Sequence, residues 1–284
     1  MVEDVLTPPA GFAVFAQTVR ELIGLDITAY NQRQLYRRLA GQLRRVGCAD
    51  LAAYARLVRQ DPARAEELRS FLTINVSDFF RDPALWETLR QQVLPQLAEE
   101  NREVLRMWSA GCSIGAEAYS LSILATELAL PGTVRILATD IDTGVLAQAS
   151  SGRYRSNQLA GLSASRRERF FRPVEAVVPG RGGKTTIEVM WEVTPEIRQR
   201  VQFRRHNLLA DPYPIGMDLI LCRNVVIYFT PAVKHEVQQR LARSLRPGGV
   251  LFVGGTETLL QPAAYGLEPI APFLYRKTAS MRKS

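Results

Sequence analysis

The stretch VLRMWSAGCSIGAEAYS, residues 104–120, decides the fold. It opens with a short apolar run at residues 104–108 and continues into a turn that contains Gly111 and Gly115. Residues 116–129 then predict a helix, with apolar residues at Tyr119, Leu121, Ile123, Leu124 and Leu128. A strand, a glycine-containing turn and a helix in this order predict the opening unit of a doubly wound α/β sheet.

The segments that follow predict further strands of the same sheet. Residues 134–138 form a second apolar run that ends at Asp140, and residues 218–222 form a third. A helix is predicted after Thr230, which can cap its first turn, and residues 250–253 give another strand. The predicted fold class is therefore α/β, with a Rossmann-like sheet.

Two regions depart from this pattern. Residues 11–70 follow helical spacing, as at Phe12, Phe15 and Val19, and predict a module of short helices. Residues 172–198 contain a glycine-rich turn between alternating segments, which is typical of a β-hairpin. We therefore predict an N-terminal helical domain at residues 1–75 and an α/β domain at residues 76–284 that includes a small β subdomain at about 172–198.

Composition narrows the class of protein. The chain has three cysteines, two histidines and no CxxC pair, so we expect free thiols and no metal site. It starts without a basic and apolar leader, and no run reaches the roughly 18 apolar residues of a membrane span, so we expect a cytoplasmic protein with no membrane insertion. The net charge of +8 suits nucleic acid, a membrane surface or an acidic protein alike.

Asp140 is the first residue that points to a ligand. It lies 25 positions after Gly115, at the end of the second predicted strand, where a carboxylate can accept both hydroxyls of a ribose. The glycine spacing is not the GxGxxG of a dinucleotide site. A structural turn and a helix-capping aspartate are the alternatives. Together with the lack of a phosphate-binding lysine, the pattern favours a nucleoside without phosphates, such as S-adenosylmethionine (SAM).

Five motifs in a fixed order make a resemblance specific. They are NVSDFFR at 75–81, WSAGCSIGAEAYS at 108–120, ATDID at 138–142, NLL at 207–209 and CRNVVIYF at 222–229, extended by RPGGVLF at 246–252 and GTET at 255–258. In these motifs, and over nearly its whole length, the chain resembles the CheR family of chemotaxis-receptor glutamate O-methyltransferases. The resemblance implies a class I methyltransferase sheet, SAM as cofactor and S-adenosylhomocysteine as product.

The resemblance also implies the contacts at one end of the cofactor. Asn75, Ser77 and Arg81 match a cofactor-binding segment in which Ser77 keeps the hydroxyl of the usual threonine. The planar guanidinium of Arg81 would bind the methionyl carboxylate, and a surface ion pair is its alternative role. Glu117 would accept the methionyl ammonium, or merely complement a helix dipole. Ala116 replaces a second glutamate of the family pattern, so one acid is left for two positive centres.

The remaining implied site residues lie in the second half of the chain. Asn207, Leu208, Arg223 and Asn224 match positions around adenine and ribose, although buried structural asparagines would look the same in sequence. Tyr228 would lie beside the transferred methyl group, or would be a packed core tyrosine. With Arg81, it is the predicted catalytic pair.

The resemblance predicts methyl transfer from SAM to glutamate side chains of methyl-accepting chemotaxis receptors. A glutamate carboxylate has a reference pKa of about 4.3, so it is already ionised at pH 7 and needs no general base. The predicted partner is the cytoplasmic helical domain of these receptors, and we expect a monomer. The predicted docking surface has arginines and no acid, although a solvated face is equally consistent with this pattern. Its residues are Arg33, Arg37, Arg38, Arg44 and Arg45.

Two other functions compete with this interpretation. The high pI of about 9.7 would suit a nucleic-acid methyltransferase, but the sequence has neither an Asn-Pro-Pro-Tyr site nor a Pro-Cys nucleophile, so we expect no nucleic-acid partner. A non-catalytic protein that binds SAM is the second alternative. Some family members also grip a receptor peptide on the β subdomain by strand addition, and we expect this chain not to depend on such a tether.

Overall fold

The computed structural model describes residues 7–101, 103–179 and 185–278. The chain divides into two compact units, each described below by itself. The helical unit consists of Met1–Ile74 and Val225–Gln238, and the α/β unit consists of Asn75–Asn224 and Gln239–Ser284. The domain limits expected from the sequence stay a prediction, because a compact unit is defined by its contacts and not by what folds independently.

The helical unit is built from short helices with polar caps. Asn31, Asp50 and Asp61 each accept a backbone N–H of the first helical turn, which satisfies a donor that has no partner inside the helix. The side chains of Phe15 and Val19 are fully buried in its core. The predicted helical module is therefore confirmed. Its elements are α1 (Phe12–Ile23), η1 (Ile27–Ala29), α2 (Gln32–Val46), α3 (Leu51–Gln60) and α4 (Pro62–Thr73).

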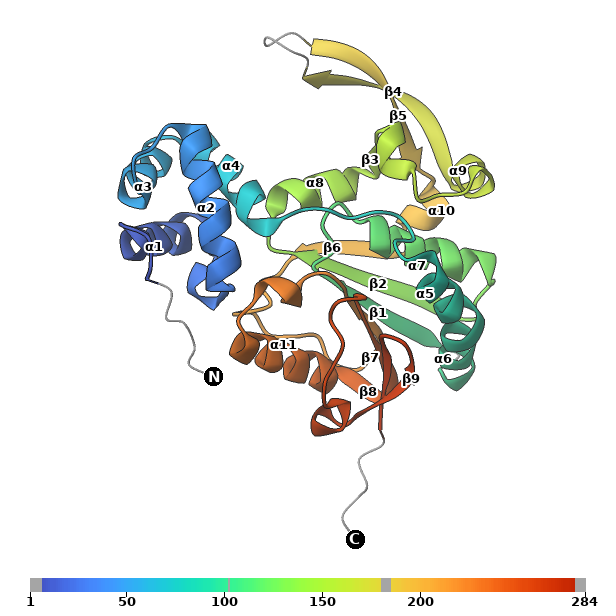
Figure 1. The fold of residues 1–284 in the computed structure, drawn as a ribbon. Helices are drawn as coiled ribbons and strands as arrows, with labels where there is room; N and C mark the ends of the chain where they lie inside the picture. The colour runs from blue at the N-terminus through green and yellow to red at the C-terminus, as the bar shows by residue number, and fades with distance from the viewer. Residues whose placement is uncertain (1–6, 102, 180–184, 279–284) are drawn as a thin grey trace. The chain divides into compact units, whose positions relative to one another are not determined.

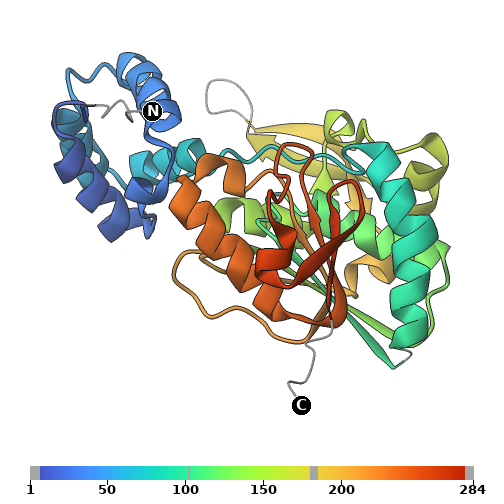
Figure 2. The ribbon, with the colours of Figure 1, turned by 60° about the horizontal axis from the view of Figure 1, so that its bottom comes forward.

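The α/β unit contains a seven-stranded sheet in the order β6-β2-β1-β7-β8-β10-β9 (Figures 1 and 2). The first five of these strands run parallel, and β10 is antiparallel to both of its neighbours. The Rossmann-like fold class is confirmed. The strands are β1 (Val104–Ala110), β2 (Thr133–Asp140), β6 (Val201–Arg205), β7 (Met217–Cys222), β8 (Leu245–Val253), β9 (Leu267–Ala271) and β10 (Leu274–Lys277).

Helices connect the strands of this unit and cover the sheet. Helix α7 is buried on almost every side, from Ala116 to Ala125, so its apolar residues are not confined to one stripe. The helices are α5 (Pro83–Thr88), η2 (Leu89–Val93), α6 (Leu94–Glu100), α7 (Ala116–Glu127), α8 (Thr143–Ser151), α9 (Ala164–Phe170), α10 (Pro195–Arg198) and α11 (Pro231–Ser244), whose first turns belong to the helical unit.

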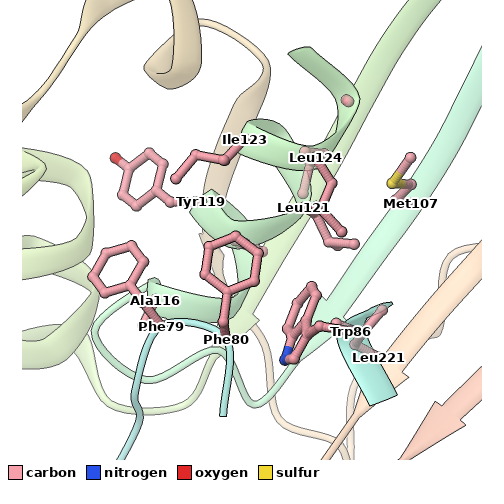
Figure 3. Close-up of a cluster of buried hydrophobic side chains, with 14 of the residues drawn as sticks. Phe79, Phe80, Trp86, Met107, Ala116, Tyr119, Leu121, Ile123, Leu124 and Leu221 are labelled. Carbon is pink, nitrogen blue, oxygen red and sulfur yellow. The ribbon is translucent and has the colours of Figure 1, made fainter. Parts of the chain in front are cut away.

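Two phenylalanines anchor the segment at 75–81 to this core. Phe79 and Phe80 point toward α7, where they lie with Trp86, Tyr119 and other buried side chains (Figure 3). The Phe80 and Trp86 rings meet edge to face at 5.3 Å between centroids. Burial of each such ring contributes about 1.5–3 kcal/mol. The polar residues on either side of the two phenylalanines are therefore held in fixed positions on the α/β unit.

The predicted β subdomain is a three-stranded sheet in the order β3-β5-β4. Strands β4 (Phe171–Pro179) and β5 (Thr185–Val193) pair antiparallel, and β3 (Arg153–Tyr154) pairs with β5. The glycine-rich turn that predicted this hairpin lies partly in residues 180–184, outside the described residues. The subdomain was expected to reach residue 198, but the last part of that range forms helix α10. No helix among the described residues is long and apolar enough to span a membrane.

Candidate functional site

Asp140 ends β2 at the carboxyl edge of the parallel sheet, where ligands of such sheets bind. Its carboxylate accepts the backbone N–H of Ser113 at 2.8 Å and that of Asp142 at 3.0 Å. The first of these bonds ties the turn after β1 to the tip of β2, and Gly111 and Cys112 add backbone bonds to the carbonyl of Thr139. The carboxylate is therefore fixed in position before any ligand binds.

Gly115 is required where that turn enters α7. Its φ is +84°, and a Cβ there would lie 3.0 Å from the side chains of Ala149 and Phe203. Both the backbone conformation and the space exclude a larger residue. Close packing against Ala149 and Phe203 therefore explains the glycine at this position, and the approach of the turn to a ligand stays a prediction.

Glu117, in the first turn of α7, is held by a buried ion pair. Its Oε1 lies 2.6 Å from Nη1 of Arg223, whose side chain is 0% exposed. Burial raises the pKa of Glu117 from its ordinary value of 4.5, while the charge of Arg223 and the hydrogen bond from it act in the opposite direction. Arg223 thus opposes the effect of burial, which favours the neutral form of this carboxyl group.

Arg223 connects Glu117 to the segment that carries Arg81. Its Nη2 lies 2.7 Å from Oδ2 of Asp82 and donates to the carbonyl oxygen of Arg81 at 3.1 Å. The guanidinium also lies 4.5 Å from the ring centroid of Phe252. The resemblance implied that Arg223 surrounds adenine and ribose. Because the guanidinium is wholly enclosed by these groups, its effect on a ligand has to pass through Glu117 and the main chain at residues 81–82.

Arg81 itself differs from Arg223 in having no partner. Its side chain is half-buried, and within the described part of the chain its guanidinium makes no hydrogen bond and no ion pair. The charge of Arg81 nevertheless lowers the pKa of Glu117, so the two groups are close enough to interact. The half-buried hydroxyl of Ser77 likewise has no partner among the described residues. A free guanidinium near an enclosed carboxylate matches the two ends of an amino-acid zwitterion.

Asn75 is oriented by Asp142. Its Nδ2 donates to Oδ2 of Asp142 at 2.6 Å, and Oδ1 of Asp142 accepts the N–H of Gly144 as the cap of α8. The Asp142 side chain is fully buried. The bond to Asn75, 67 positions away, has no local signal in the sequence.

The loop after β6 supplies Asn207 and Leu208. The N–H of His206 donates to the carbonyl of Asp140 at 2.9 Å, so this loop begins beside the tip of β2. Oδ1 of Asn207 accepts the N–H of Leu209 at 2.9 Å, which stabilises the turn, and Leu208 is buried. The structure thus brings these residues together with Asp140 and the glycine turn.

Asn224 lies beside a buried acid that the sequence did not single out. Its backbone has a φ of +60°, and its N–H donates to Oε2 of Glu257 at 2.6 Å. The same oxygen accepts the N–H of Gly254 at 2.9 Å. Glu257 belongs to the GTET motif, and its charge raises the pKa of Glu117. The motif match was the one sequence signal that could have found it.

The remaining predicted residues belong to the helical unit. Tyr228 lies half-buried in a 3₁₀ turn, where its carbonyl accepts the N–H of Asn31 at 2.7 Å. Arg38 differs from the rest of the predicted docking surface because its half-buried guanidinium donates to the carbonyl of Phe71 and lies 4.7 Å from that ring. The other four arginines of this surface are exposed, namely Arg33, Arg37, Arg44 and Arg45.

Comparison with known proteins identifies the family. The model of the CheR methyltransferase SAM binding domain matches residues 75–269, and that of the CheR methyltransferase all-alpha domain matches residues 10–73. The chain belongs to the CheR methyltransferase family. The predicted recognition and the predicted cofactor, SAM, are therefore confirmed.

Relatives in this family match along most of their length. A chemotaxis protein methyltransferase of Listeria innocua is 40% identical over 94% of this chain and 97% of that protein. Chemotaxis protein methyltransferase 1 of Pseudomonas aeruginosa is 35% identical over the same shares of the two chains. Among solved structures, SAM-bound CalS10, an amino pentose methyltransferase from Micromonospora echinaspora, is 15% identical over 63% of this chain and 57% of that one. Its TM-score of 0.33 is too low to inform the site.

The residues of this CheR-family site fit SAM. A fixed carboxylate at a strand tip suits the ribose of a nucleoside, and a carboxylate with an unpaired guanidinium nearby suits the methionyl end. The described residues contain no cluster of three or more side chains placed to hold a metal ion. Which side chains touch SAM stays a prediction for the whole set named from the sequence.

The raised pKa of Glu117 predicts how SAM binding depends on pH. Only the ionised carboxylate attracts an ammonium, so SAM affinity should fall as pH drops through that pKa, starting above 4.5. Unfolding would not explain the loss. A carboxyl group whose pKa is raised in the folded state binds its proton more tightly there, and its contribution to stability grows as pH falls through this window.

Calorimetric titration of SAM between pH 5 and pH 8 measures this effect. Glu117→Gln should bind more weakly at pH 7 and show a flatter pH profile, because the titrating group is gone. If SAM affinity had the same pH dependence in both proteins, protonation of Glu117 would not be the cause of the loss. Burial also raises the pKa of Asp140, so some pH dependence should remain in the variant.

Proposed function

We propose that this protein transfers the methyl group of SAM to glutamate carboxylates of chemotaxis receptors and so forms methyl esters. The observation that carries the proposal is the contrast between Glu117 and Arg81 inside a SAM binding domain of the CheR family. Glu117 is enclosed and paired, while Arg81 has no partner among the described residues. The names of the relatives, chemotaxis protein methyltransferases, support the receptor as the substrate.

The chemistry needs alignment rather than a strong base. When bound, SAM supplies an electrophilic methyl group on a sulfonium centre. The glutamate oxygen forms a bond to the methyl carbon, and the electron pair of the breaking C–S bond stays on sulfur. Glu117, Arg81 and Asp140 would hold the cofactor by its ammonium, carboxylate and ribose, and Tyr228 would orient the incoming carboxylate through its phenol. Holding two reactants in register can supply about 7–11 kcal/mol of the barrier.

The proposed site includes further cofactor contacts, and one residue acts indirectly. Arg223 is proposed as a positioning residue, because its enclosed side chain would act on the cofactor through Glu117 and through the main chain at residues 81–82. The proposed cofactor contacts are Asn75, Ser77, Asn207, Leu208 and Asn224, together with Arg81, Glu117 and Asp140.

Methyl ester formation tests the proposal directly. The full chain, tritiated SAM and membranes that contain chemotaxis receptors should yield protein-bound label that is released as methanol in base. Label on RNA, or base-stable label on protein, would contradict the proposal. SAM binding without any transfer to receptors would identify a SAM-binding adaptor instead.

The docking surface of α2 should favour an acidic partner. Arg33, Arg37 and Arg44 are exposed, and within the described ranges none of them makes an ion pair. We propose that receptor helices rich in glutamate bind here, since opposite charges steer association and fix orientation. Exposed charges are screened over about 8 Å at physiological ionic strength, so added salt should weaken the contact.

Charge reversal at Arg33 and Arg44 measures this contact. Arg33→Glu/Arg44→Glu should lower the rate of receptor methylation at limiting receptor concentration at least tenfold, with SAM affinity unchanged by calorimetry. Arg106→Glu/Arg135→Glu is the matched control, because it changes the net charge of the protein by the same amount. Both arginines are exposed residues of the sheet and have no ion pair among the described residues. Equal rates for the two variants would exclude α2 as the docking surface.

A further inference from the structure

Strand β3 connects the three-stranded sheet to the turn between β1 and α7. The phenol of Tyr154, in β3, donates to the backbone carbonyl of Ile114 at 2.6 Å. Ile114 lies in that turn, directly before Gly115. The Tyr154 side chain is fully buried, and its residue pairs with Trp191 of β5. One hydrogen bond therefore joins a strand of the small sheet to the main chain of the turn.

Three buried rings fix the position of this phenol. The Tyr154 ring meets that of Phe79 edge to face at 5.0 Å between centroids, and Phe79 meets Phe171 of β4 at 5.5 Å. A Cβ on Gly161 would lie 2.0 Å from the carbonyl oxygen of Phe79, so the main chain also packs closely here. Phe79 belongs to the segment at 75–81. The small sheet thus packs against two of the segments that are proposed to hold SAM.

The turn has a backbone conformation that needs support. Ser113 and Gly115 both have positive φ, +49° and +84°, and a serine rarely adopts such a φ. The N–H of Ser113 donates to the carboxylate of Asp140, and the carbonyl of the next residue, Ile114, accepts the phenol of Tyr154. Removing the phenol hydroxyl would take this partner from a carbonyl of a buried residue, which is unfavourable. The hydrogen bond from Tyr154 therefore favours the observed conformation of the turn.

We propose that Tyr154 is a positioning residue for SAM, which holds the turn in the conformation that binds the cofactor. The proposal rests on the proposed function in one respect, namely that this turn lies against SAM, and not on the identity of the methyl acceptor. Tyr154→Phe should leave the core packed, because the ring and its contacts remain. The turn should then adopt its binding conformation less often, and the apparent affinity for SAM should fall by the same factor.

Tyr119 of α7 provides a matched control. It is also fully buried, its phenol donates to a backbone carbonyl at 2.8 Å, and its ring centroid lies 6.3 Å from that of Tyr154. Tyr119 and Phe79 belong to the same buried cluster (Figure 3). The acceptor of Tyr119 is Ala149 of α8, however, and not a residue of the turn. Tyr154→Phe and Tyr119→Phe thus delete the same group from the same core, and only Tyr154→Phe removes a bond to the turn.

Calorimetric titration of SAM into the two variants of the full chain tests the proposal. Tyr154→Phe should weaken SAM binding about three- to tenfold, as expected for the loss of one hydrogen bond, and Tyr119→Phe less than about twofold. Urea unfolding should show similar losses of stability in both variants. para-Aminophenylalanine in place of Tyr154 restores a donor and should recover most of the affinity. An equal loss of SAM affinity in both variants, or no loss in Tyr154→Phe, would overturn the inference.

Backbone ¹⁵N spectra show directly whether the turn changes. In Tyr154→Phe, the amide signals of Gly111 and Gly115 should shift or broaden, because the turn exchanges between conformations, and SAM should reverse the change. In Tyr119→Phe these signals should match those of the wild type. Unchanged signals in Tyr154→Phe would overturn the inference. A wild-type protein that forms no methyl ester would overturn the proposed function instead, and the spectra and SAM titrations would still decide the role of Tyr154.

Discussion

Replacing Arg223 by methionine should destabilise the α/β unit by about 3–5 kcal/mol, the usual loss when one partner of a buried ion pair is removed. Glu117 would be left enclosed without its cation, since its side chain is 11% exposed in the pair. The loss of Arg223 should destabilise Asp82 less, because the Asp82 side chain is 47% exposed and can bind water. The loss should therefore come mainly from Glu117.

Urea unfolding of the full chain at pH 7.5 measures this loss. Arg90→Met is the control, because the pair of Arg90 with Glu87 is exposed to solvent and should contribute little to stability. Adding Glu117→Gln to Arg223→Met should recover part of the stability, since no enclosed charge then lacks a partner. A loss no larger than that of Arg90→Met would show that the buried pair contributes little.

The pH dependence of that variant provides an independent check. Without Arg223, the pKa of Glu117 should rise further, because burial already raises it and the opposing cation is gone. Protonation then removes the buried charge, so the destabilisation by Arg223→Met should shrink as pH falls toward 5. A destabilisation that is constant over this range would point to lost packing on Phe252 rather than to charge.

Replacing Arg81 by alanine should raise the dissociation constant of SAM roughly 10- to 150-fold, which corresponds to about 1.5–3 kcal/mol for a hydrogen bond to a charged group. Stability should change little, because this guanidinium has no partner among the described residues and its removal leaves no acid unpaired. Little loss of stability would distinguish Arg81→Ala from Arg223→Met, which is expected to lower the stability of the α/β unit.

A truncated cofactor separates the proposed contact from a general disturbance of the site. Methylthioadenosine lacks the amino-acid group, so its affinity should be the same in the wild type and in Arg81→Ala. Arg81→Lys should give an intermediate SAM affinity, because an ammonium keeps the charge but loses the paired N–H geometry. An equal loss of affinity for both ligands would remove Arg81 from the methionyl carboxylate.

The fold was predictable from sequence because its signals are local. Apolar runs of strand length, the glycines at 111 and 115, and Asp140 at a strand end are each read from neighbouring residues. The hairpin at β4 and β5 and the short helices of the helical unit follow from turn residues and capping residues in the same way. Ordered motifs then led to the CheR family and to SAM.

Only the tertiary structure decided which charges meet. Arg223 pairs with Glu117, 106 positions away, and with Asp82, 141 positions away, while Arg81 next to Asp82 has no partner in the described chain. Tyr228 continues a motif of the α/β unit in sequence, yet it belongs to the helical unit. The partner of a long charged side chain depends on which strands and helices pack together. The residues next to it in the sequence do not specify that packing.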